Sequence, residues 1–138
     1  MLAVLDTNVI VSALIEPRSL PGAVLRNWLE GRFELASCEQ QIEELRRVTR
    51  YPKIRSVVPA PVAGHVVKDL RESAIWIEKL PTVDICQDPM DNYLLALSQA
   101  GDADCLVTGD KADLLSLRQY GRTRVVTVRR FAELIRAR

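Results

Sequence analysis

The feature that most constrains the fold is an unbroken apolar segment, residues 2–5, that ends directly in the carboxylate of Asp6. The segment shows no alternation of polar and apolar residues, which is typical of a strand covered on both faces in a parallel sheet. In open α/β sheets ligands bind beyond the carboxyl ends of the strands, so Asp6 is a candidate site residue. Alternatively, Asp6 only caps a short helix that begins at Thr7, because aspartate is a favoured N-cap.

A chain of 138 residues corresponds to about one domain, and we predict a single domain over residues 1–138. Hydrophobic residues make up 48% and charged residues 27%, which indicates a globular chain rather than a disordered one. No apolar run approaches the roughly 20 residues of a membrane span, and the amino terminus lacks a cleavable leader pattern. We therefore expect a cytoplasmic protein that makes no membrane contact.

Cysteine and histidine are poorly placed to bind a soft metal. The three cysteines, Cys38, Cys86 and Cys105, show no CxxC spacing and lie in apolar surroundings, so we expect buried free thiols. His65 is the only histidine, and one histidine cannot build a His-based zinc site or a His triad. Both residue types are therefore assigned structural roles.

The net charge of +1 conceals a strong asymmetry along the chain. Residues 84–110 contain six acids and no lysine or arginine, whereas residues 111–138 contain eight basic residues against Asp113 and Glu133. An acidic focus beside a basic surface suits a metal-dependent enzyme that acts on a polyanion, because metal and phosphate require opposite fields. As an alternative, the arginines lie on ordinary solvated helix faces.

The alternation of strand-like and helix-like segments predicts a mainly parallel sheet with helices on both faces. After the first strand, further strands are expected at residues 33–36, 82–86, 105–108 and 124–128. Helices are expected at residues 9–15, 19–31, 38–50, 62–79, 88–100, 113–117 and 131–136. Ser19 and Ser37 are expected to cap two of them, and Trp28 and Leu29 to face the core.

Two strands that are expected to be neighbours end in Asp6 and Asp110, on the same edge of the sheet. Asp91 begins a helix face that should lean toward that edge. On the helix at residues 38–50, Glu44 lies about 100° from the centre of the buried stripe, whereas Glu43 lies about 160° away and should be solvated. We therefore expect four carboxylates, Asp6, Glu44, Asp91 and Asp110, to converge on one cleft.

Crowded carboxylates are unstable without cations, and hard divalent ions prefer oxygen ligands. Mg²⁺ or Mn²⁺ is the expected cofactor, and two such ions can activate water and stabilise the leaving oxygen of a phosphodiester. Asn8, Asn92 and Thr108 are short polar residues next to the acids and are suited to orient them by hydrogen bonds. Asp88 is expected mainly to cap the helix, with a possible water-mediated contact to a second metal.

Four motifs in this order and spacing resemble one known family. They are Leu-Asp-Thr-Asn-Val at residues 5–9, Glu-Glu-Leu followed by Arg-Tyr-Pro-Lys, Asp-Pro-Met-Asp-Asn at 88–92, and Val-Thr-Gly-Asp-Lys-Ala-Asp-Leu-Leu at 107–115. The chain resembles the PIN domain, and more narrowly the VapC-like toxin components of bacterial toxin-antitoxin systems.

The resemblance implies a three-layer α/β/α sandwich and an endoribonuclease that depends on Mg²⁺ or Mn²⁺. It also implies an RNA substrate, a cognate antitoxin protein as partner, and a homodimer. Carried over by position, the acidic residues of the family fall on Asp6, Glu44, Asp91 and Asp110.

Two other functions fit parts of the pattern. A phosphatase of the haloacid-dehalogenase type also begins with an apolar strand that ends in aspartate, but it needs a second acid two residues later, where this chain has Asn8. A PIN scaffold without activity that binds RNA or a protein partner is the second alternative. A metal-dependent nuclease assay separates these classes.

Overall fold

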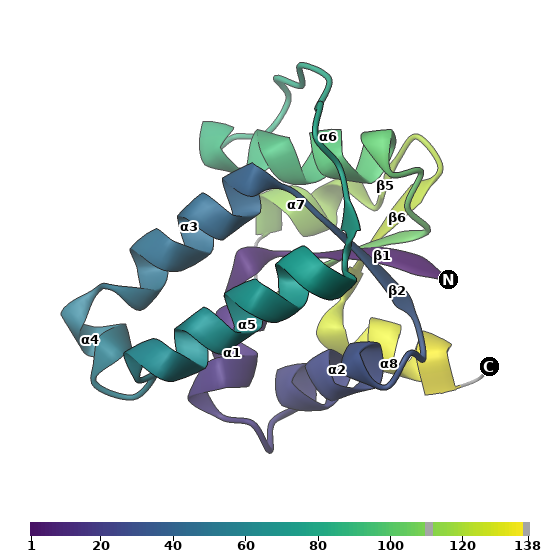
Figure 1. The fold of residues 1–138 in the computed structure, drawn as a ribbon. Helices are drawn as coiled ribbons and strands as arrows, with labels where there is room; N and C mark the ends of the chain where they lie inside the picture. The colour runs from purple at the N-terminus through teal and green to yellow at the C-terminus, as the bar shows by residue number, and fades with distance from the viewer. Residues whose placement is uncertain (110–111, 137–138) are drawn as a thin grey trace.

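The computed structural model describes residues 1–109 and 112–136, in which six strands form one sheet of order β3-β2-β1-β4-β6-β5 (Figure 1). The strands are β1 (Leu2–Leu5), β2 (Glu34–Ser37), β3 (Ile75–Trp76), β4 (Cys105–Thr108), β5 (Gln119–Tyr120) and β6 (Thr123–Thr127). The helices are α1 (Thr7–Ile15), α2 (Leu20–Leu29), α3 (Glu39–Thr49), α4 (Pro52–Arg55), α5 (Ala60–Ser73), the 3₁₀ turn η1 (Pro89–Asp91), α6 (Asn92–Ala100), α7 (Ala112–Leu117) and α8 (Val128–Arg136).

Strand β1 lies in the middle of the sheet, as its uninterrupted apolar sequence predicts. It pairs in parallel with β2 through Ala3 and Leu35, and in parallel with β4 through Leu5 and Val107. The predicted neighbourhood of β1 and β4 is therefore confirmed. Their carboxyl ends meet at one edge, directly before Asp6 on the first strand.

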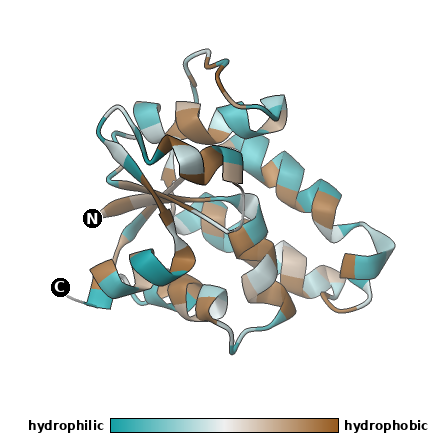
Figure 2. Ribbon diagram, turned by 180° about the vertical axis from the view of Figure 1, so that it is seen from behind, coloured by the Kyte–Doolittle hydropathy of each residue, from teal (hydrophilic) through white to brown (hydrophobic). Residues whose placement is uncertain are grey.

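Helices cover both faces of the sheet, so the fold is the predicted three-layer α/β/α sandwich (Figure 1). Successive strand residues alternate between the two hydrophobic cores: Leu5 packs in one with α1, α2, α3, α5 and α8, and Val4 packs in the other with α6 and α7. Figure 2 shows hydrophobic residues along the strands and on the inner sides of the flanking helices. The absence of alternation in the sequence thus reflects burial on both faces.

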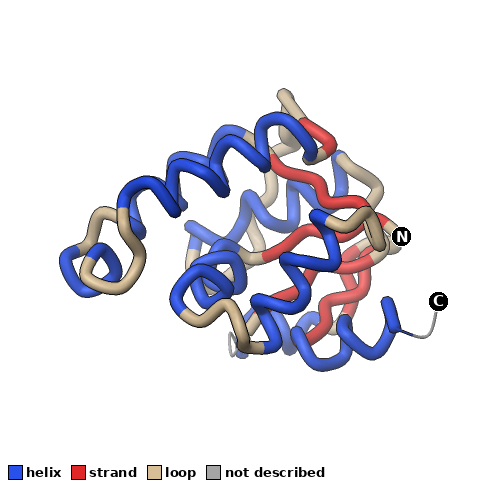
Figure 3. Tube along the Cα trace, turned by 60° about the horizontal axis from the view of Figure 1, so that its bottom comes forward, coloured by secondary structure: helices blue, strands red, loops and turns tan. Residues whose placement is uncertain are grey.

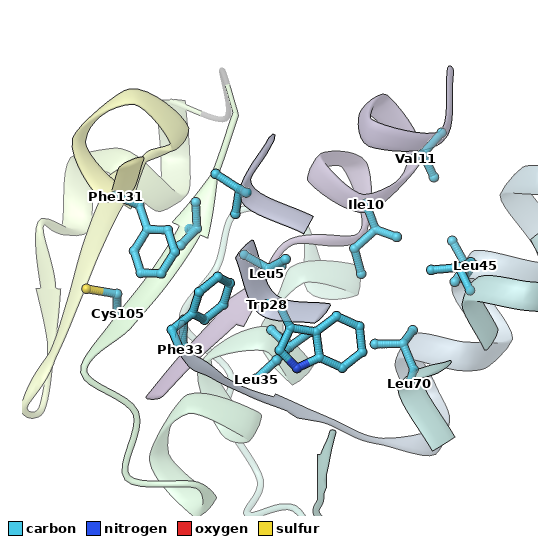
Figure 4. Close-up of a cluster of buried hydrophobic side chains, with 14 of the residues drawn as sticks. Leu5, Ile10, Val11, Trp28, Phe33, Leu35, Leu45, Leu70, Cys105 and Phe131 are labelled. Atoms are coloured by element: carbon cyan, nitrogen blue, oxygen red, sulfur yellow. The ribbon is translucent and has the colours of Figure 1, made fainter. Parts of the chain in front are cut away.

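Three aromatic residues, Trp28, Phe33 and Phe131, pack among aliphatic side chains in the larger core (Figure 4). Phe33 and Phe131 pack edge to face, with ring centroids 4.9 Å apart, and Trp28 is 5% exposed. Each such side chain contributes about 2–3 kcal/mol relative to an exposed position. The predicted core role of Trp28 is confirmed, whereas the same prediction for Leu29 is wrong, because the end of α2 leaves Leu29 51% exposed.

Helices α3, α4 and α5 form a projection that extends beyond the sheet (Figures 1 and 3), and we call residues 39–73 the arm. The base of the arm is tied by a bidentate ion pair in which Arg71 donates to both oxygens of Glu39, at 2.9 and 3.0 Å. This hydrogen-bonded guanidinium lowers the pKa of Glu39. The Arg71 guanidinium also lies 5.4 Å from the ring centroid of Trp76 on β3.

Two predicted elements near the end of the arm differ from the structure. The helix predicted at 62–79 ends at Ser73, because the chain turns extended at Ala74 and β3 then pairs with β2. The strand predicted at 82–86 is not a strand in the structure, since β3 already occupies this edge of the sheet. Pairing with β2 outweighed helix propensity at the end of α5 and left no place for a strand at 82–86. The pattern of a single sequence contains no information about such a partner strand.

Smaller differences have local causes. Ser37 is the last residue of β2 rather than a helix cap, and the capping position of α3 falls on Cys38, which makes no side-chain capping bond. The short strand β5 was not predicted, and it pairs antiparallel with β6 around Gly121 at φ +58°. Cys38 and Cys105 are buried as expected, and burial raises the pKa of both thiols, whereas Cys86 is only half-buried.

Within the described ranges we find no helix with the length and apolar character needed to cross a membrane.

Candidate functional site

Asp6 lies at the junction of β1 and α1 with its side chain only 1% exposed. One carboxylate oxygen accepts the hydroxyl of Thr108 at 2.9 Å, and the other accepts the backbone N–H of Asn8 at 3.2 Å. Asp6 therefore caps α1, as one alternative predicts, and it also stands at the carboxyl edge of the sheet, while its role as a site residue stays a prediction. These two hydrogen bonds fix the orientation of the Asp6 carboxylate at this edge.

A buried glutamine fixes helix α3 against the end of β1. Gln41 is fully buried and donates to the backbone carbonyl of Leu5 at 2.6 Å, and its own carbonyl accepts the hydroxyl of Ser37 at 2.6 Å. Its amide also lies 3.5 Å from the Thr7 hydroxyl. Because these contacts join β1, β2 and α3, the position of Glu44, one turn further along α3, is set relative to Asp6.

Glu44 and Glu43 differ in the way that the helical geometry predicts. The Glu43 side chain is exposed, whereas the Glu44 carboxylate is only 16% exposed and accepts the hydroxyl of Tyr93 at 2.5 Å. Its other oxygen lies 3.9 Å from the guanidinium of Arg47. The predicted orientation of Glu44 toward the sheet edge is therefore confirmed, although its predicted role in metal binding stays a prediction.

Tyr93 is a site residue that the sequence pattern did not reveal. Its hydroxyl lies 2.8 Å from the Thr7 hydroxyl and 2.5 Å from Glu44. Since its single proton goes to Glu44, the Thr7 hydroxyl donates to the tyrosine oxygen. Burial and the adjacent Glu44 charge raise the pKa of Tyr93 well above its ordinary value. The hydroxyl therefore stays a hydrogen-bond donor at any physiological pH and holds Glu44 beside the residue that follows Asp6.

Asp91 and Asp88 border a hollow of about 490 Å³ at the amino-terminal end of α6. Asp91 is 3% exposed, whereas Asp88 is exposed and accepts the backbone N–H of Met90 at 3.0 Å, the predicted capping role. Gln87, Ala112 and Asp113 complete the lining. The hollow is thus lined by three carboxylates and an amide, a set of oxygen donors that suits a hard divalent cation.

Asp113 is the second residue that sequence reasoning missed. One of its carboxylate oxygens is buried and has no hydrogen-bond partner within the described part of the chain. A buried polar atom left unsatisfied costs about 1–3 kcal/mol, so a cation is a natural partner for it. The only sequence signal was an acid three residues after Asp110, and an acid in the first turn of a helix such as α7 is common without any site.

The residues predicted to orient the acids fall into different places. Thr108 is buried and contacts Asp6 as predicted, while Asn8 contributes its backbone N–H and leaves its side chain exposed. Asn92 instead accepts the backbone N–H groups of Ile85 and Cys86, at 3.2 and 2.9 Å. The role of Asn92 is therefore to hold the segment before η1 in place.

Asp110, the fourth predicted acid, lies outside the described residues. In residues 1–109 and 112–136, no group of three or more His, Cys, Asp or Glu side chains is placed to hold a metal ion together. The four-carboxylate centre therefore stays a prediction. The residues fit a divalent cation by their chemistry, because buried carboxylates and the unsatisfied oxygen of Asp113 offer only hard donors.

On the prediction that Glu44 binds metal, Tyr93→Phe is expected to weaken Mn²⁺ binding about tenfold, the lower range for loss of a group that orients a metal ligand. Phenylalanine keeps the ring and removes the hydroxyl that donates to Glu44 and accepts from Thr7. Isothermal titration with Mn²⁺ measures the effect. Tyr120→Phe is the matched control, because the Tyr120 hydroxyl bonds to exposed Gln99 instead. Equal affinities for wild type and Tyr93→Phe would show that Glu44 needs no such support.

Comparison with known proteins places this geometry in context. Residues 3–112 match a family model described as PIN domain. An uncharacterized protein of Methanocaldococcus jannaschii is 30% identical over 118 residues, which cover 83% of this chain and 74% of the relative. The solved structure of the PIN domain of human SMG5 superposes with a TM-score of 0.50 at 15% identity, covering 97% of this chain and 98% of that one. The last is a likeness of fold alone.

Proposed function

This chain belongs to the PIN domain family, whose members are generally nucleases, and on that premise we propose that it is a metal-dependent endoribonuclease. The observation that carries the proposal is the placement of Asp6 and Asp91. Both carboxylates are at most 3% exposed, at the carboxyl edge of the sheet and at the start of α6. Burial of ionised groups is costly unless they are compensated, and such groups concentrate at functional sites.

The proposed ligands of Mg²⁺ or Mn²⁺ are Asp6, Glu44, Asp91 and Asp110, with Asp113 as a further candidate. When bound, such an ion polarises the scissile phosphate and lowers the pKa of its water. The chain's own part is orientation: Thr108 and the Asn8 N–H hold the Asp6 carboxylate, and Tyr93 holds Glu44. These bonds fix the two carboxylates before substrate arrives, which reduces the reorganisation needed during reaction.

The narrower assignment rests on the order of the four sequence motifs. Their resemblance to VapC-like proteins supports a toxin of a toxin-antitoxin system, held in check in the cytoplasm by an antitoxin protein and acting as a homodimer. RNA is the proposed substrate.

A second candidate function is a scaffold that binds RNA or a protein partner without cleaving it. The observation in its favour is that the acids among the described residues do not form a group of three ready to hold a metal. It predicts RNA binding with no cleavage at any metal concentration.

Cleavage of a fluorescently labelled single-stranded RNA is expected in Mn²⁺ or Mg²⁺ and should be lost in excess EDTA. The physical reason is that the oxygen-only donor set depends on a divalent cation for its catalytic effect. Gel analysis of the products measures it, and re-adding Mn²⁺ beyond the chelator is the control. Full activity in excess EDTA contradicts the metal mechanism, and no cleavage under any condition favours the binding scaffold.

A further inference from the structure

The arm carries the most concentrated positive charge of the chain. Residues 45–68 contain six basic residues and no aspartate or glutamate, in a protein whose net charge is only +1. They are Arg46, Arg47, Arg50, Lys53, Arg55 and Lys68. Neither the fold nor the acidic site accounts for this charge. Such a run can simply be solvated, so the placement of the side chains decides whether it forms a site.

Three of these arginines line one hollow of about 260 Å³ whose lining residues come from α3, α4, α5 and the chain between them. They are Arg46, Arg50 and Arg55, and no ion pair to a described residue engages any of them. Arg55 donates its Nε to the backbone carbonyl of Thr49 at 3.3 Å, which holds the guanidinium at the hollow. Three like charges around one space repel one another, and a bound anion removes the repulsion.

Gly64 is an exposed glycine of α5 that packing does not require. It lies within α5 on the wall of the same hollow, and a Cβ built on it would meet no atom within 4 Å. Glycine is among the least favourable residues in a helix interior, and close packing does not explain its presence here. Without a side chain at this position, the wall of the hollow stays open to a group that approaches the backbone.

We propose that this hollow binds a backbone phosphate of the RNA strand whose scissile bond lies at the acidic site. The proposal rests on the proposed function. Arginine matches phosphate through its planar fork of donors, and three arginines suit a group with several acceptor oxygens. The α5 side of the hollow, across from the arginines, carries only the short side chains of Ala60 and Ala63 beside Gly64.

Helix α3 connects the acidic site to this hollow and carries side chains that an RNA strand could contact between them. Glu44, Arg47 and Arg50 are spaced by three residues and form one oblique ridge that runs from the partly buried Glu44 to two exposed arginines. The Arg47 guanidinium stands 3.9 Å from Glu44, at the beginning of the ridge. From Glu44 to Arg50 the helix rises about 9 Å, a distance that a few nucleotides span. This continuity favours RNA over an anionic membrane or a phosphopeptide.

The test is the binding of a labelled 20-nucleotide oligouridine RNA by fluorescence anisotropy in EDTA, at several salt concentrations. The triple variant Arg46→Gln, Arg50→Gln, Arg55→Gln should raise Kd about tenfold and reduce the salt slope by about 0.7, the value for one lost phosphate contact on a single strand. The control Arg18→Gln, Arg32→Gln, Arg129→Gln removes the same charge from exposed positions off the arm and should weaken binding much less. An equal loss of RNA affinity in both triple variants would contradict phosphate binding in the hollow.

A second pair of variants tests the same hollow without removing an arginine. Gly64→Ala and Gly64→Glu both improve helix propensity, so neither should unfold α5. Only Gly64→Glu places a carboxylate among the three guanidinium groups, and only it should weaken RNA binding several-fold. If both bind RNA like wild type, the proposal is wrong.

The outcomes separate this proposal from the proposed function. Loss of RNA binding in the arm variants, with no cleavage by wild type in Mn²⁺, would overturn the nuclease and leave the hollow as the phosphate site of an RNA-binding scaffold. Unchanged RNA binding in the arm variants, with normal cleavage by wild type, would overturn the phosphate site alone. Phosphatidylserine vesicles that bind wild type but not the triple variant, while RNA binding is equal for both, would overturn it in favour of a membrane surface.

Discussion

Asp6→Asn is expected to reduce RNA cleavage by on the order of 100-fold or more, since metal-mediated charge stabilisation amounts to several kcal/mol and about 1.4 kcal/mol corresponds to a factor of ten. Asparagine keeps the size of the side chain and can still accept the hydroxyl of Thr108, so the fold should persist. The substitution removes the carboxylate of Asp6, which is 1% exposed and follows β1 beside β4. Initial rates in saturating Mn²⁺ measure the loss.

Thermal unfolding of the same variant separates a chemical effect from a structural one. Wild type should melt at a higher temperature with Mn²⁺ than in EDTA, because a ligand that binds only the folded state stabilises it. Asp6→Asn should melt cooperatively and gain less from Mn²⁺. Asp102→Asn is the control, since Asp102 is exposed and has φ +55°, a conformation that asparagine also adopts. Normal cleavage by Asp6→Asn would remove Asp6 from the catalytic site.

Glu44→Gln and Glu43→Gln are expected to differ sharply although the two residues are adjacent. Glu44→Gln should weaken Mn²⁺ binding and reduce cleavage by about tenfold or more, because it removes the charge of a carboxylate that is 16% exposed and hydrogen-bonded to Tyr93. Glu43→Gln should leave both properties nearly unchanged, because Glu43 is exposed and an isolated surface charge contributes little.

The two glutamine variants serve as controls for each other, since they make the same chemical change one residue apart on α3. They should be assayed side by side for Mn²⁺ affinity and RNA cleavage. A greater loss in Glu43→Gln would reassign the residue and leave the nuclease class intact. Equally small losses of Mn²⁺ affinity and cleavage in both variants would show that the metal site does not need a carboxylate from α3.

Much of the fold could be predicted because its signals are local. Residues 2–5 have no polar member, and this alone indicated a strand covered on both faces, which is the position that β1 takes between β2 and β4. The 100° step of a helix separated Glu44 from Glu43 before any neighbour was known. Period and polarity are properties of a short window, so the sequence carries them directly.

The errors and omissions concern partners far apart in the chain. The end of α5 was decided by pairing of β3 with β2, about 40 residues earlier, and not by the apolar pattern at 62–79. Tyr93 was missed because its partner Glu44 lies 49 positions away, and nothing near Tyr93 in the sequence marks its hydroxyl as buried. A tyrosine in an apolar helix is compatible with ordinary core packing.

By itself, the sequence determined most of the longer strands and helices, the central place of the first strand, and the inward direction of Asp6, Glu44 and Asp91. Only the tertiary structure decided what those carboxylates touch, that Asp113 keeps a buried oxygen without a partner among the described residues, and that the arginines of the arm share one hollow. The reason is physical. The face of an element follows from its own backbone geometry, whereas a hydrogen bond between distant residues forms only after packing has brought their elements together.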